Sequence, residues 1–138
     1  LILARELDLQ NEFEEIQIQN LIPEALREGN ASDFLKRLSE LDGIYQNIKD
    51  AQGPNEVLRY IGELSGDLQQ DKGKLEVKLI SVPTNSALGS LKGSDSIFEI
   101  YTESYGEQPI VIQGAGAGAS VTARGVFGDI LRLSEKKL

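Results

Sequence analysis

The feature that most constrains this chain is a run of six small residues, Gly114–Ala119, near its C-terminal end. The run follows an apolar segment at 109–113 that is typical of a strand, and it precedes an amphipathic segment that is typical of a helix. Its spacing satisfies G-x-G-x-x-A, which marks a dinucleotide-binding turn. That fold also needs a second parallel strand after the helix, with an acidic residue that holds the ribose. Because about one helix of sequence follows the run, we do not expect that fold here.

The physical reasons for such a turn remain. Glycine and alanine let the backbone turn sharply and let another group approach it closely. The first N–H groups of the following helix attract an anion or a polarised oxygen. Ser120 or Thr122 could cap that helix or donate a hydroxyl. The alternative is a purely structural connection that packs the helix tightly against a sheet, and the pattern alone leaves both interpretations open.

Alternating apolar and polar residues predict the strands. A short one is expected at 16–19, and two longer ones at 57–64 and 75–82 form an antiparallel hairpin across a turn at 66–73. A further strand at 96–101 precedes the one at 109–113.

Apolar residues spaced three and four apart predict the helices. The first covers residues 1–7. The second begins with Ser32 or Asp33 as its N-cap, is kinked or split at Gly43 and ends before the turn at 53–55. The last carries an apolar stripe from Val121 to Leu133, and Lys136 and Lys137 complement its C-terminal dipole. These elements predict a single α+β domain over residues 1–138, with an antiparallel or mixed sheet and helices on one side.

Composition excludes several classes of function. The chain has no cysteine and no histidine, so disulfides, thiol nucleophiles, histidine bases and most zinc sites are excluded. The net charge of −8, from 22 acidic and 14 basic residues, argues against nucleic acid as a partner. There is no membrane-spanning apolar run and no signal-peptide pattern, and we expect a cytoplasmic protein.

No residue set predicts a catalytic or a metal site. The acidic cluster, the lysines beside the 66–73 turn and the tyrosines of the strands are interpreted as solvated or structural residues. They are Glu12, Glu14, Glu15, Lys72, Lys74, Tyr60, Tyr101 and Tyr105.

Segments along the whole chain resemble homoserine dehydrogenases. The most specific is the tail, where 111–119 is followed by Val-Thr-Ala at 121–123 and by 125–131. Residues 1–6 resemble the helix after the family's catalytic segment, and 91–95 resemble a loop before its penultimate strand. Residues 57–62 resemble a strand of the bifunctional aspartokinase–homoserine dehydrogenases.

The resemblance implies an oxidoreductase that reduces aspartate semialdehyde to homoserine with NADPH or NADH. It implies that Gly118 lies against the nicotinamide nucleotide, with Gly116, Ala119 and Thr122 as neighbours. The family's catalytic lysine and acidic substrate ligands precede the position of Leu1. With the uncapped apolar start of the chain, this leads us to expect a fragment that is inactive alone and that forms a homodimer in the intact enzyme.

Two departures limit what can be transferred. Ser86-Ala87 stands where many relatives carry His-Pro, and Ser96 stands where they often carry Asn. A choice between NADP and NAD, and the presence of a fused aspartokinase domain, do not follow from these residues. The alternative function is a non-enzymatic α+β module for oligomerisation or ligand sensing, in which an edge of the 57–82 hairpin pairs with a partner.

Overall fold

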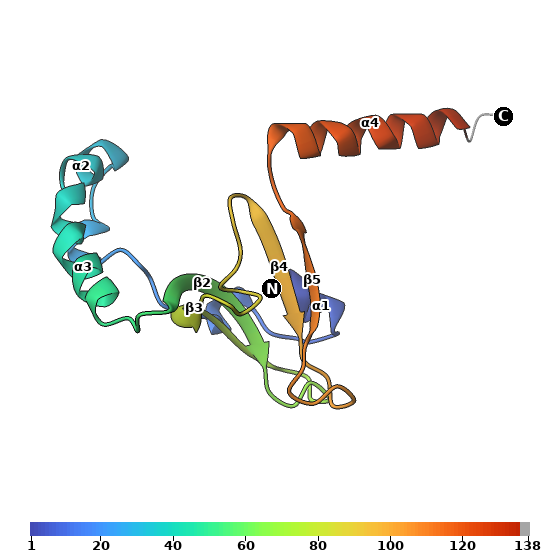
Figure 1. The fold of residues 1–138 in the computed structure, drawn as a ribbon, viewed down its shortest axis with the longest axis horizontal. Coiled ribbons are helices and arrows are strands. Elements are labelled where there is room, and N and C mark those ends of the chain that lie inside the picture. The colour runs from blue at the N-terminus through green and yellow to red at the C-terminus, as the bar shows by residue number, and fades with distance from the viewer. Residues whose placement is uncertain (136–138) are drawn as a thin grey trace. The chain divides into compact units, whose positions relative to one another are not determined.

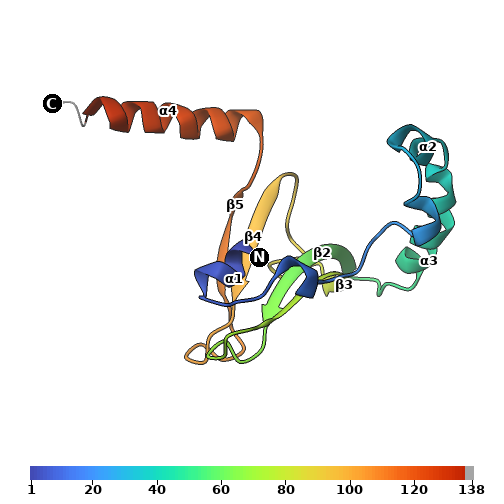
Figure 2. The same ribbon diagram turned by 180° about the vertical axis from the view of Figure 1, so that it is seen from behind.

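The computed structural model describes residues 1–135. These residues divide into two compact units, of which the first is Leu1–Thr84 and the second begins at Asn85. We describe each unit by itself (Figures 1 and 2).

The first unit contains a three-stranded mixed sheet. In it, β2 (Glu56–Ser65) and β3 (Lys74–Pro83) form the long antiparallel hairpin expected from the sequence. The short strand β1 (Gln17–Ile18) lies on the other side of β3 and runs parallel to it, giving the order β1-β3-β2. The sequence therefore predicted each strand to within about one residue at either end.

A small apolar core holds the N-terminal helix α1 (Ile2–Glu6) to this sheet. Ala4, Leu9 and Leu75 are buried together, and Ile16 and Leu64 pack against them. Leu64 and Leu75 are register partners across the hairpin, so the end of the hairpin is covered by the N-terminal segment. Between that core and β1 the chain forms one turn of 3₁₀ helix, η1 (Phe13–Glu15).

The helical segment after β1 differs from the predicted one. It consists of four short pieces: η2 (Glu24–Leu26), α2 (Ala31–Lys36), η3 (Leu38–Leu41) and α3 (Asp42–Asp50). In both views α2 and α3 lie beyond one end of the hairpin (Figures 1 and 2).

Two details of this prediction were wrong. α2 begins at Ala31, so its N-cap is Asn30 and not Ser32 or Asp33, which both lie inside the helix. The Asn30 side-chain oxygen accepts the Asp33 N–H at 3.0 Å. The break lies near Arg37, and Gly43 is inside α3. The Arg37 guanidinium binds both Glu40 and the Ala25 carbonyl, which holds the chain at the break.

The second unit contains a two-stranded antiparallel sheet and one long helix. β4 (Asp95–Ile100) pairs with β5 (Ile110–Ala115), and α4 (Ala119–Glu135) follows. No described residue of this unit is buried. The predicted contribution of Lys136 and Lys137 to the end of α4 lies outside the described residues. Together the two units confirm the α+β class, and the single-domain boundary stays a prediction.

Candidate functional site

The glycine and alanine run resolves into the last two residues of β5, a three-residue turn and the start of α4. β5 ends at Ala115 and α4 begins at Ala119, so the turn consists of Gly116, Ala117 and Gly118. The four residues predicted to face a cofactor lie at this turn or in the first helical turn after it. They are Gly116, Gly118, Ala119 and Thr122.

Gly118 is required by its backbone conformation. Its φ is +132°, which L side chains rarely adopt, and a Cβ at this position would meet nothing within 4 Å. Its carbonyl accepts the Thr122 N–H at 3.0 Å, which is the first bond of α4. Gly118 is therefore the N-terminal boundary of the helix, and it faces open space.

Gly116 is required for a different reason. Its N–H donates to the Ser94 carbonyl at 3.1 Å. A Cβ on Gly116 would lie 1.9 Å from Ser96 Oγ and 2.8 Å from Ser96 Cβ, so no side chain fits. In contrast, a Cβ on Gly114, inside β5, would meet nothing within 4 Å. The structure thus explains Gly116 and Gly118 in separate ways and gives no reason for a glycine at 114.

The start of α4 offers hydrogen-bond donors without intrahelical partners. Helix geometry leaves the N–H groups of Ala119, Ser120 and Val121 unpaired within the helix, because the Thr122 N–H makes the first bond. The first turn contains no acidic residue that would repel an anion. Ser120 and Thr122 both lie inside α4, so the idea that either one caps it was wrong. Thr122 retains a hydroxyl that could donate.

The apolar stripe predicted for this helix is present but exposed. Along α4 the large apolar side chains are 39–66% exposed. They are Val121, Val126, Phe127, Ile130, Leu131 and Leu133. Figure 1 shows α4 projecting from the end of β5. The amphipathic pattern therefore corresponds to a surface that the described residues of this unit leave uncovered.

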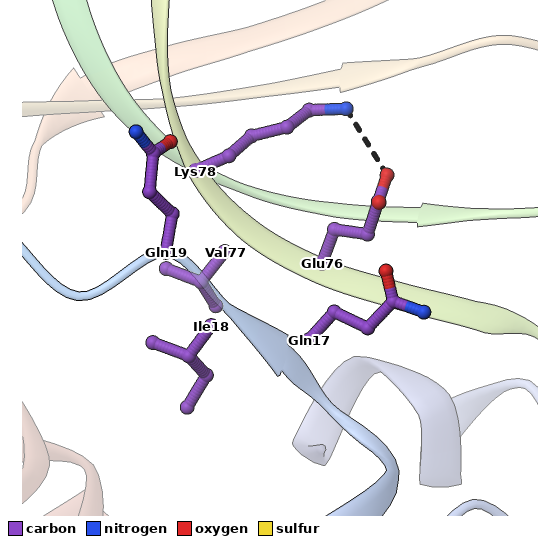
Figure 3. A pocket seen from close by; sticks show the side chains of 6 residues that line it. All are labelled: Gln17, Ile18, Gln19, Glu76, Val77 and Lys78. Atoms are coloured by element: carbon purple, nitrogen blue, oxygen red, sulfur yellow. Dashed lines mark hydrogen bonds and ion pairs between the residues drawn. The ribbon is translucent and has the colours of Figure 1, made fainter.

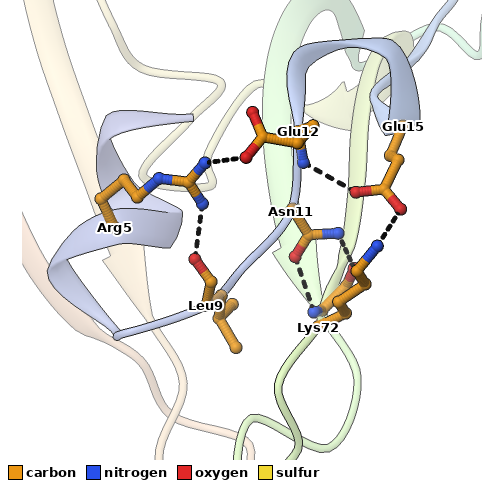
Figure 4. Close-up of polar contacts among 7 residues, drawn as sticks. Arg5, Leu9, Asn11, Glu12, Glu15 and Lys72 are labelled. Carbon is orange, nitrogen blue, oxygen red and sulfur yellow. Dashed lines mark hydrogen bonds and ion pairs between the residues drawn. The ribbon is translucent and has the colours of Figure 1, made fainter.

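Two acidic residues and one turn lysine, Glu12, Glu15 and Lys72, lie in a network of the first unit that we call the N-terminal clamp. It consists of Arg5, Leu9, Asn11, Glu12, Glu15, Lys72 and Gly73 (Figure 4).

At the centre of this clamp the Asn11 amide group, 4% exposed, binds Gly73 twice: it donates to the carbonyl and accepts the N–H, both at 2.9 Å. Glu12 pairs with Arg5 at 2.9 Å, and Glu15 pairs with Lys72. The Lys72 ammonium and the Glu12 N–H lower the pKa of Glu15. Sequence reasoning missed Asn11, because its partner is 62 residues away and no local pattern joins them.

The other residues considered for catalysis occupy structural positions. Tyr60 is in β2, and its hydroxyl donates to the Gln19 carbonyl at 2.9 Å. Lys74 pairs with Glu76, and both Lys74 and Lys78 lower the pKa of that glutamate. Tyr101 follows β4, and partial burial with a hydrogen bond to Glu99 raises its pKa.

Two hollows on the surface of the described residues do not resemble a dinucleotide site. One groove of about 240 Å³ lies between β1 and β3, and Figure 3 shows the six residues that line it. They are Gln17, Ile18, Gln19, Glu76, Val77 and Lys78. Typical small-molecule pockets have about 300–1,000 Å³ and are largely apolar. A second hollow, of about 620 Å³, falls within that range of volumes, but only four consecutive polar loop residues, 69–72, line it.

Within residues 1–135, no group of three or more acidic side chains is arranged to hold a metal ion. No helix in the same range is long and apolar enough to cross a bilayer.

Comparison with known proteins gives consistent matches along the chain. Residues 1–131 match the family model described as homoserine dehydrogenase. The chain is 43% identical over 136 residues to a chloroplastic bifunctional aspartokinase/homoserine dehydrogenase from Daucus carota. That match covers 97% of this chain and 14% of the carrot protein. It is 39% identical over 139 residues to a homoserine dehydrogenase from Paracoccidioides brasiliensis, which covers 98% of this chain and 36% of the fungal protein.

A solved structure extends the match to the fold. A crystal structure of a Candida auris protein of unknown function has a TM-score of 0.72 and 36% identity. The match covers 97% of this chain and 37% of that one. This chain therefore spans well under half the length of each of these relatives. The match to the family model over nearly every residue shows that the chain belongs to the homoserine dehydrogenase family.

Proposed function

We propose that these 138 residues are the C-terminal part of an NAD(P)-dependent homoserine dehydrogenase that interconverts aspartate semialdehyde and homoserine. In this proposal the turn at Gly116–Gly118 and the start of α4 form one wall of the cofactor site. The first unit contributes sheet and dimer contact. The observation that carries the proposal is the open, left-handed Gly118 at the N-terminus of a helix, in a chain of this family.

The residues of the turn fit a nicotinamide nucleotide. Gly118 presents no side chain and has open space where a Cβ would point. The N–H groups of residues 119–121 are positioned to donate to a phosphate or carboxamide oxygen, and the helix dipole favours negative charge there. The Thr122 N–H is already bonded to Gly118, so Thr122 would contribute only its hydroxyl. Small residues at 117 and 119 keep the approach open.

The bound nicotinamide would supply or accept hydride, and this chain's own residues would bind and orient it. A backbone wall without side chains allows close approach, which positions the reacting ring and excludes water beside it. No general acid or base is proposed within residues 1–138. We therefore place those groups in another part of the intact enzyme, and we expect no turnover from this segment alone.

The test is a substitution of Gly118 in the full-length enzyme. Gly118→Val forces a β-branched side chain into a left-handed conformation and fills the space that the cofactor would occupy. We expect the KM for the nicotinamide cofactor to rise at least tenfold, or turnover to be lost. The matched control is Gly114→Val in β5, where a Cβ meets nothing within 4 Å and valine suits a strand. Wild-type kinetics for Gly118→Val would mean that the turn is only a structural connection and does not face the cofactor.

A second measurement separates this proposal from a non-enzymatic module. If the segment forms only one wall of the site, calorimetry of the isolated 138 residues should detect no NADPH binding. Tight binding by the isolated segment would contradict the one-wall proposal. A parent protein that lacks a dinucleotide-binding segment before Leu1 would instead favour the module for oligomerisation or ligand sensing.

A further inference from the structure

The contact between Ser96 and Gly116 carries an inference about how the turn is positioned. We propose that Ser96 is a positioning residue, and that its contact with the bare Gly116 backbone sets where the cofactor-facing turn begins. This inference rests on the proposed function, because it assigns the contact a role in cofactor binding.

The β4–β5 ladder continues one step beyond the end of β5. Asp95 and Ala115 are the last register partners of the two strands. The next pair outward is Ser94 and Gly116, and the Gly116 N–H donates to the Ser94 carbonyl at 3.1 Å. Ser96 is opposite Gly114 in the register, so Gly116 is its diagonal neighbour on the same face. The turn therefore starts from a backbone position fixed by one hydrogen bond and one side chain.

The Ser96 side chain occupies the place that a side chain at 116 would need. A Cβ there would lie 1.9 Å from Ser96 Oγ, well over an ångström short of ordinary contact. Rotation of the hydroxyl would not relieve the clash, because Ser96 Cβ would still be only 2.8 Å away. The backbone of the turn would have to move.

Any such movement reaches the cofactor wall directly. Only Ala117 separates Gly116 from Gly118, whose carbonyl begins α4. Gly116 is not among the glycines with positive φ, whereas Gly118 is, so backbone strain does not explain the glycine at 116. Displacements of about 1 Å near a reacting centre can lower the rate on the order of a hundredfold. The contact between Ser96 and Gly116 therefore sets how well the turn positions the cofactor.

The experiment uses four variants of the full-length enzyme. Gly116→Ala introduces the clash. Ser96→Gly in the same chain removes both Ser96 atoms that cause it and leaves only the Ser94 carbonyl, at 3.3 Å from the new Cβ. Gly116→Ala with Ser96→Ala is intermediate, because it removes Oγ and leaves Cβ at 2.8 Å. Gly114→Ala is the matched control, since a Cβ there meets nothing within 4 Å. The KM for cofactor, the KM for aldehyde, kcat and the melting temperature are measured for each.

We expect Gly116→Ala to raise the cofactor KM about tenfold or more, with the aldehyde KM within twofold of wild type. Ser96→Gly should restore most of the cofactor KM in that background, and Ser96→Ala only part of it. A melting temperature that falls while the cofactor KM stays at the wild-type value would overturn the positioning role. If Gly116→Ala alone does not fold, we expect the double variant Gly116→Ala with Ser96→Gly to fold. A double variant that also fails to fold would contradict the inference.

Gly118→Val separates this inference from the proposed function. If Gly118→Val raises the cofactor KM and Gly116→Ala does not, the Ser96–Gly116 contact has no positioning role and the cofactor wall stands. If neither variant changes the cofactor KM, the cofactor wall itself is wrong.

Discussion

The N-terminal clamp and the turn before α4 are both irregular connections, and they treat their polar groups in opposite ways. In the clamp, the buried Asn11 amide satisfies the N–H and the carbonyl of Gly73, and the surrounding charges are paired within the chain. In the turn, Gly118 adopts a positive φ that L side chains rarely reach, and the N–H groups that follow have no intrahelical partner. The polar side chains of the clamp are paired with one another, whereas the first N–H groups of α4 have no partner within the helix.

This difference supports the proposal that the turn, and not the clamp, contributes to a site completed by another part of the enzyme. A glycine with positive φ lets the backbone turn sharply and lets another group approach it closely. The clamp is stabilised by a small apolar core and by the two hydrogen bonds between Asn11 and Gly73. The turn has open space, unpaired donors and no buried neighbour. We therefore interpret the clamp as a structural region and the turn as a region shaped for a ligand.

The largest effect should come from removing the Asn11 amide. Asn11→Ala leaves both half-buried backbone groups of Gly73 without their partner, which should cost about 2–4 kcal/mol. Hydrogen exchange of the 66–75 segment in the full-length protein measures that local opening. The control is Asn47→Ala, the same substitution at an exposed position of α3, which should change stability by less than about 0.5 kcal/mol. Equal exchange in both variants would show that the clamp is not held as we describe.

A smaller loss of stability is expected from a side chain at Gly73, the glycine of the clamp. A Cβ on Gly73 would lie 3.0 Å from the fully buried Leu9 side chain and 3.3 Å from the Ser65 carbonyl. Gly73→Ala should therefore destabilise the hairpin by about 1–2 kcal/mol. Gly62→Ala in β2 provides the contrast, since a Cβ there meets nothing within 4 Å and alanine lowers the entropy of the unfolded chain. Thermal unfolding of the two variants should shift the melting temperature in opposite directions, and a common shift would contradict the packing argument.

Local patterns predicted the regular elements well. The alternation of Leu75, Val77 and Leu79 predicted β3, and the spacing of apolar residues predicted α4. The segment from Asn30 to Asp50 was harder, because its break at Arg37 depends on a guanidinium that reaches the Ala25 carbonyl. Contacts over long sequence separations set such details, and propensity does not report them.

The candidate site was predictable in part. The run of small residues indicated a close approach, and the structure divides it into Gly118 with positive φ and Gly116 beside Ser96. The pattern could not make that division, because the Ser96 contact exists only once β4 and β5 are in register. The assignment of Gly118, Gly116, Ala119 and Thr122 to cofactor binding stays a prediction.

The smallest expected effect is a pH dependence of stability that comes from Glu15 in the clamp. The Lys72 ammonium and the Glu12 N–H hold the pKa of Glu15 below its ordinary value. A lowered carboxyl pKa contributes stability above its unfolded value, about 4.3, and that contribution is lost as pH falls through the lower folded value. Glu15→Gln should therefore lower the melting temperature of the full-length protein slightly at pH 7, and the gap to wild type should close as pH falls below about 4.

Glu14→Gln serves as the matched control, because the Glu14 carboxylate is in no ion pair within residues 1–135. It should leave the melting temperature nearly unchanged at every pH. A gap between wild type and Glu15→Gln that persists at low pH would mean that the carboxylate charge is not what Lys72 recognises. The hydrogen-bond donors at the Gly118 turn are backbone N–H groups, which do not ionise between about pH 4 and 7. We therefore expect the stability of the clamp, and not the conformation of the turn, to depend on pH in this range.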